Sequence, residues 1–143
     1  MKKRQSLILV MSSMIASCLN AQESTDDWVG YWINGIEFTK DQNSYPKVVD
    51  TYNTAIRILT PDQISLQLNL VNERGDLYVK MLDFDHAIKD YSYVLNHPQA
   101  NQEQKMEALW GRSKAYLATG RIQDFEKDSQ ELEKLQSLIT PIA

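Results

Sequence analysis

Gly75-Asp76-Leu77-Tyr78 and Asp83-Phe84-Asp85-His86-Ala87-Ile88-Lys89-Asp90-Tyr91 are the two segments that decide the fold. In each segment a small residue is followed, three or four positions later, by a tyrosine, so both lie on one face of a helix. Small residues let two helices approach closely, and the rings fill the space between them. The run Leu82-Asp83-Phe84-Asp85 breaks the helical pattern. These segments therefore predict two antiparallel helices joined by a short turn.

Apolar residues recur at helical spacing on both sides of this pair. Upstream they predict helices over 27–40 and 46–59, and then a helix entered at Thr60-Pro61 that ends near residue 81. Downstream they predict a helix that ends at 96–98, a polar link at 99–102, a helix over 106–117 and, after a turn at Gly120, a helix over 122–138. We therefore expect an all-α fold of six helices in three antiparallel pairs.

The three pairs are related in sequence. Four sets of apolar positions recur at a nearly constant interval along the chain, which is the signature of an internal repeat. The sets are Phe38, Tyr78 and Tyr116; Tyr52 and Tyr91; Ala55, Val94 and Leu132; and Val48, Ala87 and Phe125.

The central pair resembles the tetratricopeptide repeat. The small residues of that family's motif match Gly75 and Ala87, and its aromatic residues match Tyr78 and Tyr91. The resemblance covers about residues 28–137 and implies three helical hairpins stacked as a short right-handed solenoid.

The flanking repeats depart from the family pattern. The first needs one inserted residue near Pro46, and the third has Ser113 in place of the glycine and Phe125 in place of the alanine. The intervals also exceed the usual repeat of about 34 residues, which implies longer helices or turns.

The resemblance further implies a binding groove, because in this family the first helix of each pair lines a concave surface that takes peptides. The matching positions, repeat by repeat, are Trp32 and Ile36; Asn72, Asp76 and Lys80; and Trp110 and Lys114. Indole rings would anchor a ligand there. Large aromatic residues at helical spacing also pack in cores, so a place in the groove and a place in the core both stay open for the two tryptophans. Of the family's clamp for a C-terminal carboxylate only Asn72 is matched, so we do not expect that ligand.

The N-terminal segment, 1–21, has the pattern of an export signal. Met1-Lys2-Lys3-Arg4 is basic, and the apolar run over 7–16 is shorter than the roughly 20 residues of a membrane-spanning helix. Two cleavage sites compete. A lipobox, Ile15-Ala16-Ser17-Cys18, would lipidate Cys18, and a cut after Ala21 would release the chain at Gln22. We favour the lipobox because small residues precede its cysteine.

Removal of this signal leaves a linker over 22–27 and a helical domain over 28–139. It also takes the formal charge from −4 to −7, which argues against nucleic acid or an anionic membrane surface as the partner. The single cysteine, Cys18, cannot form a disulfide within the chain. Lipid on that cysteine is the only membrane attachment that we expect.

The best candidate for catalysis or metal binding is Asp83-Phe84-Asp85-His86. An acidic turn of this kind is also the ordinary connection between two helices, where Asp85 would cap the second helix and interact with its dipole. Because no second group of ligands completes a site, we expect no catalytic residue, no metal and no cofactor.

We therefore expect a non-catalytic protein-binding adaptor of the bacterial envelope, periplasmic or anchored to the outer membrane. A secreted or periplasmic effector that binds another protein is the alternative, and a cut after Ala21 would favour it. A hydrolase on a helical scaffold is a third class, which a polar pocket with perturbed titratable groups would support. The final hairpin has no extra capping helix after 138–141, so we also expect an apolar face that a second copy or another protein covers, including a homodimer through the C-terminal helix.

Overall fold

The computed structural model describes residues 42–139, and every regular element in this part of the chain is helical. The signal, both cleavage sites and the expected helix over 27–40 lie outside the described residues. The all-α prediction is confirmed for the described part. Its elements are a 3-10 turn η1 (Gln42–Ser44), helix α3 (Tyr45–Ile58), a 3-10 turn η2 (Pro61–Gln63), and helices α4 (Ile64–Lys80), α5 (Phe84–Asn96), α6 (Gln102–Ala118) and α7 (Ile122–Ile139).

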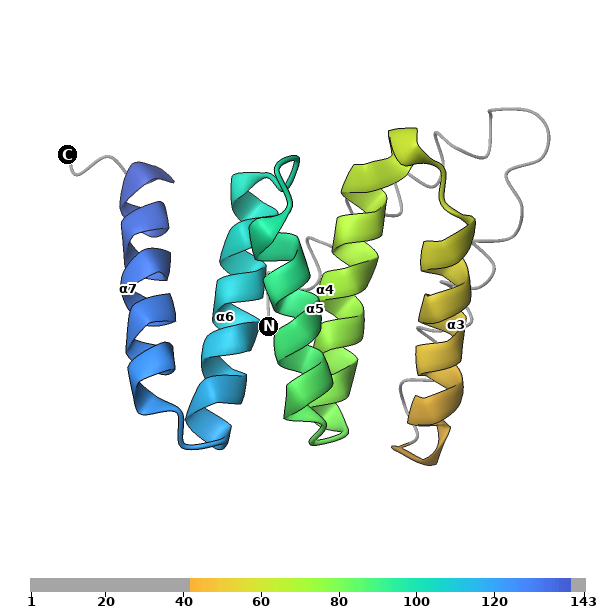
Figure 1. Cartoon of the computed structure of the whole chain (residues 1–143), viewed down its shortest axis with the longest axis horizontal. Coiled ribbons are helices and arrows are strands. Elements are labelled where there is room, and N and C mark those ends of the chain that lie inside the picture. Colours follow the sequence, from red (N-terminus) through yellow and green to blue (C-terminus); the bar gives the residue numbers. More distant parts are fainter. Residues whose placement is uncertain (1–41, 140–143) are drawn as a thin grey trace.

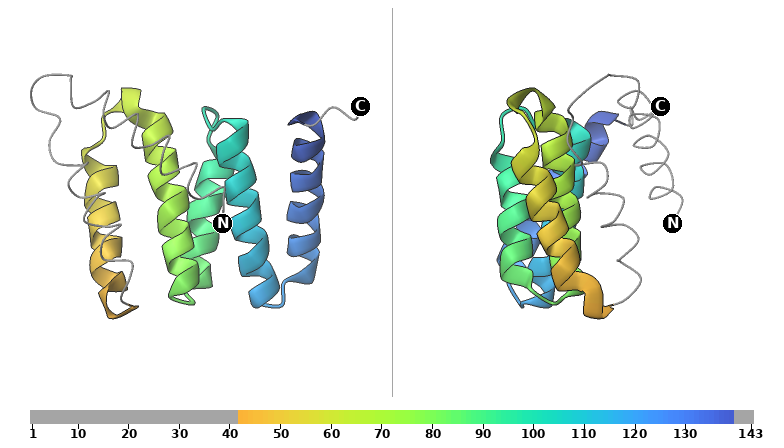
Figure 2. Two further views of the ribbon diagram at one scale, coloured as in Figure 1. Left: turned by 180° about the vertical axis from the view of Figure 1, so that it is seen from behind. Right: turned by 90° about the vertical axis from the view of Figure 1, so that its right-hand side faces the viewer.

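Consecutive helices run antiparallel and lie side by side in chain order (Figure 1). In addition, α4 contacts α6 directly, although α5 separates them in the sequence. Figures 1 and 2 show the reason: α5 is nearer the viewer from the front, whereas α4 and α6 are nearer from behind. One side of the α4–α6 contact is thus covered by α5, and α4 and α6 together form the opposite side.

Local signals set the helix boundaries. The side chain of Asn101 accepts from the backbone N–H of Gln104 at 2.9 Å, and the side chain of Gln104 accepts in return from the backbone N–H of Asn101, which fixes the start of α6. The N-cap of α5 is Asp83, whose carboxylate accepts from the N–H of His86. The capping role expected for Asp85 is therefore wrong; Asp85 lies in the first turn, where its charge favours the helix dipole.

The turns after α4 and α6 have the same conformation. Leu82 and Gly120 are both left-handed, with φ of 60° and 73°. The next residue in each turn donates its N–H back to a tyrosine carbonyl at 2.9 Å, Asp83 to Tyr78 and Arg121 to Tyr116. This bond satisfies a carbonyl that the helix end would leave unpaired.

The Tyr91 ring holds α4, α5 and α6 together. Its side chain is 1% exposed. A Cβ built on Gly75 of α4 would lie 2.8 Å from the ring, and one built on Gly111 of α6 would lie 2.3 Å from it. Both glycines therefore let helix backbones touch an aromatic face. The Tyr91 hydroxyl donates to Asp76 at 2.6 Å, which satisfies the polar end of the buried ring.

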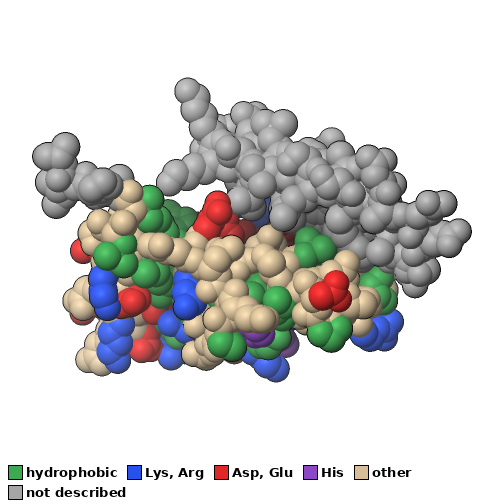
Figure 3. Space-filling view, turned by 90° about the horizontal axis from the view of Figure 1, so that it is seen from above, with side chains coloured by type: hydrophobic (Ala, Val, Ile, Leu, Met, Phe, Trp, Pro, Cys, Tyr) green, Lys and Arg blue, Asp and Glu red, His purple; other side chains and the backbone are tan. Residues whose placement is uncertain are grey.

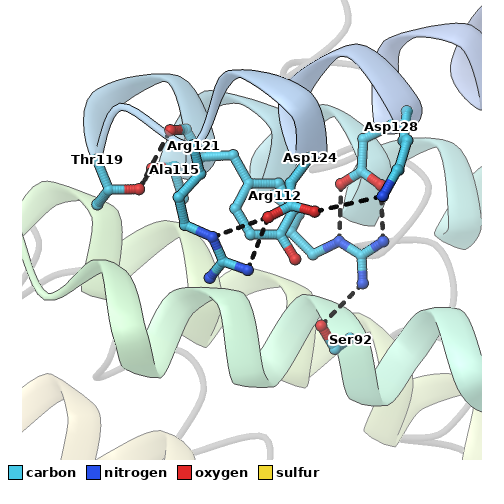
Figure 4. A network of polar contacts seen from close by, with 9 residues as sticks. Ser92, Arg112, Ala115, Thr119, Arg121, Asp124 and Asp128 are labelled. Atoms are coloured by element: carbon cyan, nitrogen blue, oxygen red, sulfur yellow. Dashed lines mark hydrogen bonds and ion pairs between the residues drawn. The ribbon is translucent and has the colours of Figure 1, made fainter.

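Two equivalent ion pairs join the helices. Arg74 of α4 contacts both oxygens of Asp90 on α5 at 2.7 Å, and in the next hairpin Arg112 of α6 contacts both oxygens of Asp128 on α7 at 2.7 Å. Each arginine also reaches the helix before: Arg74 donates to Asn53, and Arg112 donates to Ser92 (Figure 4). Planar guanidinium groups suit such two-oxygen contacts. Each cluster therefore links three consecutive helices.

We predict that Gly111→Ala lowers the free energy of unfolding by about 1 to 3 kcal/mol, because the new methyl group would overlap the Tyr91 ring. In a Tyr91→Leu background the same substitution should cost far less, since the ring is gone and alanine favours helix. Urea unfolding of the two single variants and the double variant measures this coupling. Additive effects would show that the glycine does not make room for the ring.

Candidate functional site

The structure places five of the seven predicted groove residues on α4 and α6. Asn72, Asp76 and Lys80 follow one another at intervals of four along α4, and Trp110 and Lys114 do so on α6. We call this surface the α4/α6 face; it also contains Glu103 and Glu107 on α6. Trp32 and Ile36 lie outside the described residues, as does Cys18.

Trp110 is at the surface. Its side chain is 57% exposed, so it is not part of the core formed by the described residues. The ammonium nitrogen of Lys114, one turn later, lies 4.9 Å from the centre of the indole ring. This distance is that of a cation–π contact. The face therefore presents an aromatic side chain that already accommodates a cation.

Buried amides connect α4 to α6 beneath the face. Gln104 is 3% exposed, and its Nε2 donates to the side chain of Asn69 at 2.7 Å and to the carbonyl of Ser65 at 2.9 Å. Asn72 is 4% exposed, and its Nδ2 donates to the carbonyl of Gln104 at 3.0 Å. These bonds fix how α6 sits against α4, and with it the spacing of the side chains on the face.

One atom of this amide network is left without a partner. The Oδ1 of Asn72 is buried and accepts no hydrogen bond. The amide of Asn72 also lies near enough to the Glu107 carboxyl group to act on its pKa, which it lowers, so Asn72 is at the edge of the acidic side chains. A buried acceptor without a hydrogen bond costs free energy, so a hydrogen-bond donor placed next to this atom would stabilise the site.

Carboxyl groups gather on the face beside Asn72. Burial, followed by the negative charges of Glu103, Asp76 and Glu73, raises the pKa of Glu107 to about 7. Asp76 accepts from the hydroxyl of Tyr91, and Glu73 accepts from that of Tyr52 at 2.8 Å. Within residues 42–139, no lysine, arginine or histidine forms an ion pair with Asp76, Glu103 or Glu107. These three carboxyl groups of the face are therefore not neutralised by an ion pair within the described residues.

Three residues of the site were not predicted from the sequence, namely Glu103, Glu107 and Gln104. Glu103, Glu107, Trp110 and Lys114 follow helical spacing and form one stripe along α6, so this periodicity would have pointed to the two glutamates. Gln104 had only its place in the capping box as a signal. Its contact with α4 depends on the packing of two helices that are not consecutive.

The Asp83–His86 pair has the geometry of a surface contact. The Nδ1 of His86 lies 2.8 Å from Asp83 Oδ2, with 60% and 38% of the two side chains exposed. The imidazole also stacks on the Tyr78 ring at 5.0 Å. In the described part of the chain, no three His, Cys, Asp or Glu side chains are grouped so that they could hold a metal ion. This contact therefore accompanies the N-cap of α5, in which Asp83 accepts from the backbone N–H of His86.

The last helix exposes charged residues along most of its outer side. It buries Leu132 and the paired Asp128, whereas Glu126, Lys127, Glu131, Glu133 and Lys134 are exposed. Exposed apolar side chains on α7 lie only near its ends, at Ile122, Leu138 and Ile139. No helix between residues 42 and 139 has both the length and the apolar character needed to cross a membrane.

We predict that Glu107 makes stability depend on pH near neutrality. Its carboxyl group keeps its proton up to a pKa of about 7 when folded, against 4.5 ordinarily, so this contribution is complete below 4.5 and is lost as the pH rises through 7. Glu107→Gln should remove about 1 to 2 kcal/mol of pH dependence between pH 5 and 8, allowing for partial exposure. Urea unfolding across this range measures the effect, with Glu126→Gln on α7 as the control. Equal slopes in wild type and Glu107→Gln would contradict the prediction.

Comparison with known proteins gives no match that assigns a family. No protein-family model matches the sequence. No curated protein and no solved structure is significantly similar to it. The function must therefore be inferred from the site itself.

Proposed function

We propose that this chain is a non-catalytic protein-binding module of tetratricopeptide type, and that the α4/α6 face binds a segment of a partner protein. The observation that carries the proposal is the exposed indole of Trp110 on a face that is otherwise polar and charged. A large aromatic ring at the surface, among groups that can hydrogen-bond, is the composition that concentrates binding energy in protein interfaces.

The repeat architecture is supported by contacts that recur at one interval. The same interval separates the Arg–Asp pair of α4–α5 from that of α6–α7, and the left-handed turn at Leu82 from that at Gly120. Equal contacts at an equal interval are expected when two hairpins are copies of one unit. In this scheme α3 is the second helix of a first hairpin, and its first helix is the one expected over 27–40. The three hairpins would form a short right-handed solenoid.

The size of the exposed ring agrees with a binding role. An aromatic side chain buries about 150 to 250 Å² when it is fully covered, so covering the exposed part of Trp110 would contribute about 2 to 4 kcal/mol. That range is typical of the residues that dominate binding in alanine scans. Trp110 alone can therefore account for much of the affinity of a modest complex.

The proposed setting is the bacterial envelope, with the module exported and anchored through lipid on Cys18. A cut after Ala21 would instead release the chain as a secreted or periplasmic effector. Both settings use the same face to bind a protein, and both are consistent with the acidic charge of −7 that remains once the signal is removed. The mature N-terminal residue, Cys18 or Gln22, distinguishes them.

We predict that a photoreactive phenylalanine at position 110 crosslinks to a partner protein in the cells that produce this chain. The same side chain at position 93 is a matched control, because Tyr93 is also an exposed aromatic residue, 46% accessible, but lies on α5. The expected result is a discrete crosslinked band from position 110 that is absent from position 93, identified by mass spectrometry. Identical bands from both positions, or bands from position 93 alone, would overturn the assignment of the face.

A further inference from the structure

The carboxyl groups of the α4/α6 face lie close enough to affect one another. Glu107 has its pKa raised by the charges of Glu103 on its own helix and of Asp76 and Glu73 on α4. Two of these groups, Asp76 and Glu103, are exposed, and Glu107 is half-buried. The repulsion costs free energy that a cation between them would recover. The first requirement of a ligand at this place is therefore positive charge.

Asn72 gives a second and independent requirement. Its buried Oδ1 accepts no hydrogen bond, and the same amide is near enough to the Glu107 carboxyl group to lower the pKa of that group. An acceptor left in this state is satisfied only by a hydrogen-bond donor. Lysine and arginine side chains are both cations and donors, with three and five N–H groups respectively.

A bare metal ion fits these observations less well. No group of His, Cys, Asp and Glu side chains in the described residues is arranged to hold one. Next to the carboxylates on α6, the indole of Trp110 already lies against the ammonium group of Lys114. Aromatic surface beside negative charge suits a peptide that carries both apolar and basic side chains.

The two basic residues of the α4/α6 face lie toward one end of it. Figure 3 looks down on the ends of the helices, and the lysine and arginine side chains that can be seen there lie mostly toward the α7 end of the row. Of the residues that define the α4/α6 face, only Lys80 and Lys114 are basic, and both lie near the C-terminal ends of their helices. A basic segment would therefore meet the carboxyl groups of Glu103 and Glu107 on the N-terminal half of α6, away from the two lysines.

We infer that the α4/α6 face binds a lysine- or arginine-bearing segment of the partner, with a cation that pairs with Glu107 near Asp76 and Glu103 and donates to Asn72. This inference rests on the proposed function and narrows it to one chemistry of partner. An apolar residue next to that cation covers the exposed ring of Trp110.

The test uses the purified chain and two fluorescent ten-residue peptides of the same apolar sequence, one with four lysines and one with glutamates in their place. Fluorescence anisotropy at pH 8 and low salt should show the lysine peptide binding at least about tenfold more tightly. Glu103→Gln/Glu107→Gln should weaken this binding by about five- to tenfold, because both carboxylates face the cation. Affinity should also rise from pH 6 to pH 8 as Glu107, faced by Glu103, Asp76, Glu73 and the amide of Asn72, loses its proton.

The matched control is Glu126→Gln/Glu133→Gln, which removes the same charge from exposed positions on α7. It should leave the affinity for the lysine peptide unchanged. Equal weakening by both double variants would mean that net charge alone attracts the peptide, and would overturn the inference. If the chain dimerises and Glu103→Gln/Glu107→Gln abolishes the dimer, a second copy of the chain is what occupies the face. That result would also overturn the inference.

The outcomes separate this inference from the proposed function. If both peptides bind equally and Trp110→Ala weakens both, the face binds peptides but does not select cations, so only the inference fails. If neither peptide binds and position 110 yields no crosslinked partner, the proposed function fails with it.

Discussion

The contact of the Tyr91 ring with the backbones of Gly75 and Gly111 is the constraint on which the described structure depends. It sets the separation of α4, α5 and α6 at once, because the ring lies against two glycines from different helices. The hydroxyl of the same tyrosine donates a hydrogen bond to the surface carboxylate of Asp76 at 2.6 Å. Core packing thereby positions a charged group of the α4/α6 face.

The two Arg–Asp clusters have a complementary role. Desolvating a buried ion pair costs about as much as the pair's attraction returns, so such pairs add little stability, but loss of one partner is strongly unfavourable. The clusters at Arg74 and Arg112 therefore act mainly on register, since each arginine must meet a carboxylate on the next helix and a polar group on the helix before. Their repetition in successive hairpins extends one packing geometry along the chain.

The helical periodicity of the sequence predicted α3 to α7 to within a few residues, because amphipathic spacing and the Pro, Gly and polar breaks are local signals. Trp110 and Asp76 were predicted to share a surface through the family resemblance. Gly111 was not singled out, because Ser113 occupies the family position; the close approach to Tyr91 depends on a three-helix contact. The left-handed Leu82 was equally hidden, since leucine rarely adopts that conformation.

The site combines an exposed indole, an unsatisfied buried acceptor and mutually repelling carboxylates, all on the two helices that Tyr91 holds together. A basic segment of a partner would meet all three. Hydrogen–deuterium exchange of the purified chain, with and without a saturating lysine-bearing peptide, tests this account most directly. We predict slower exchange in residues 64–80 and 102–118 and no change in 84–96; protection confined to α5 or α7 would contradict it.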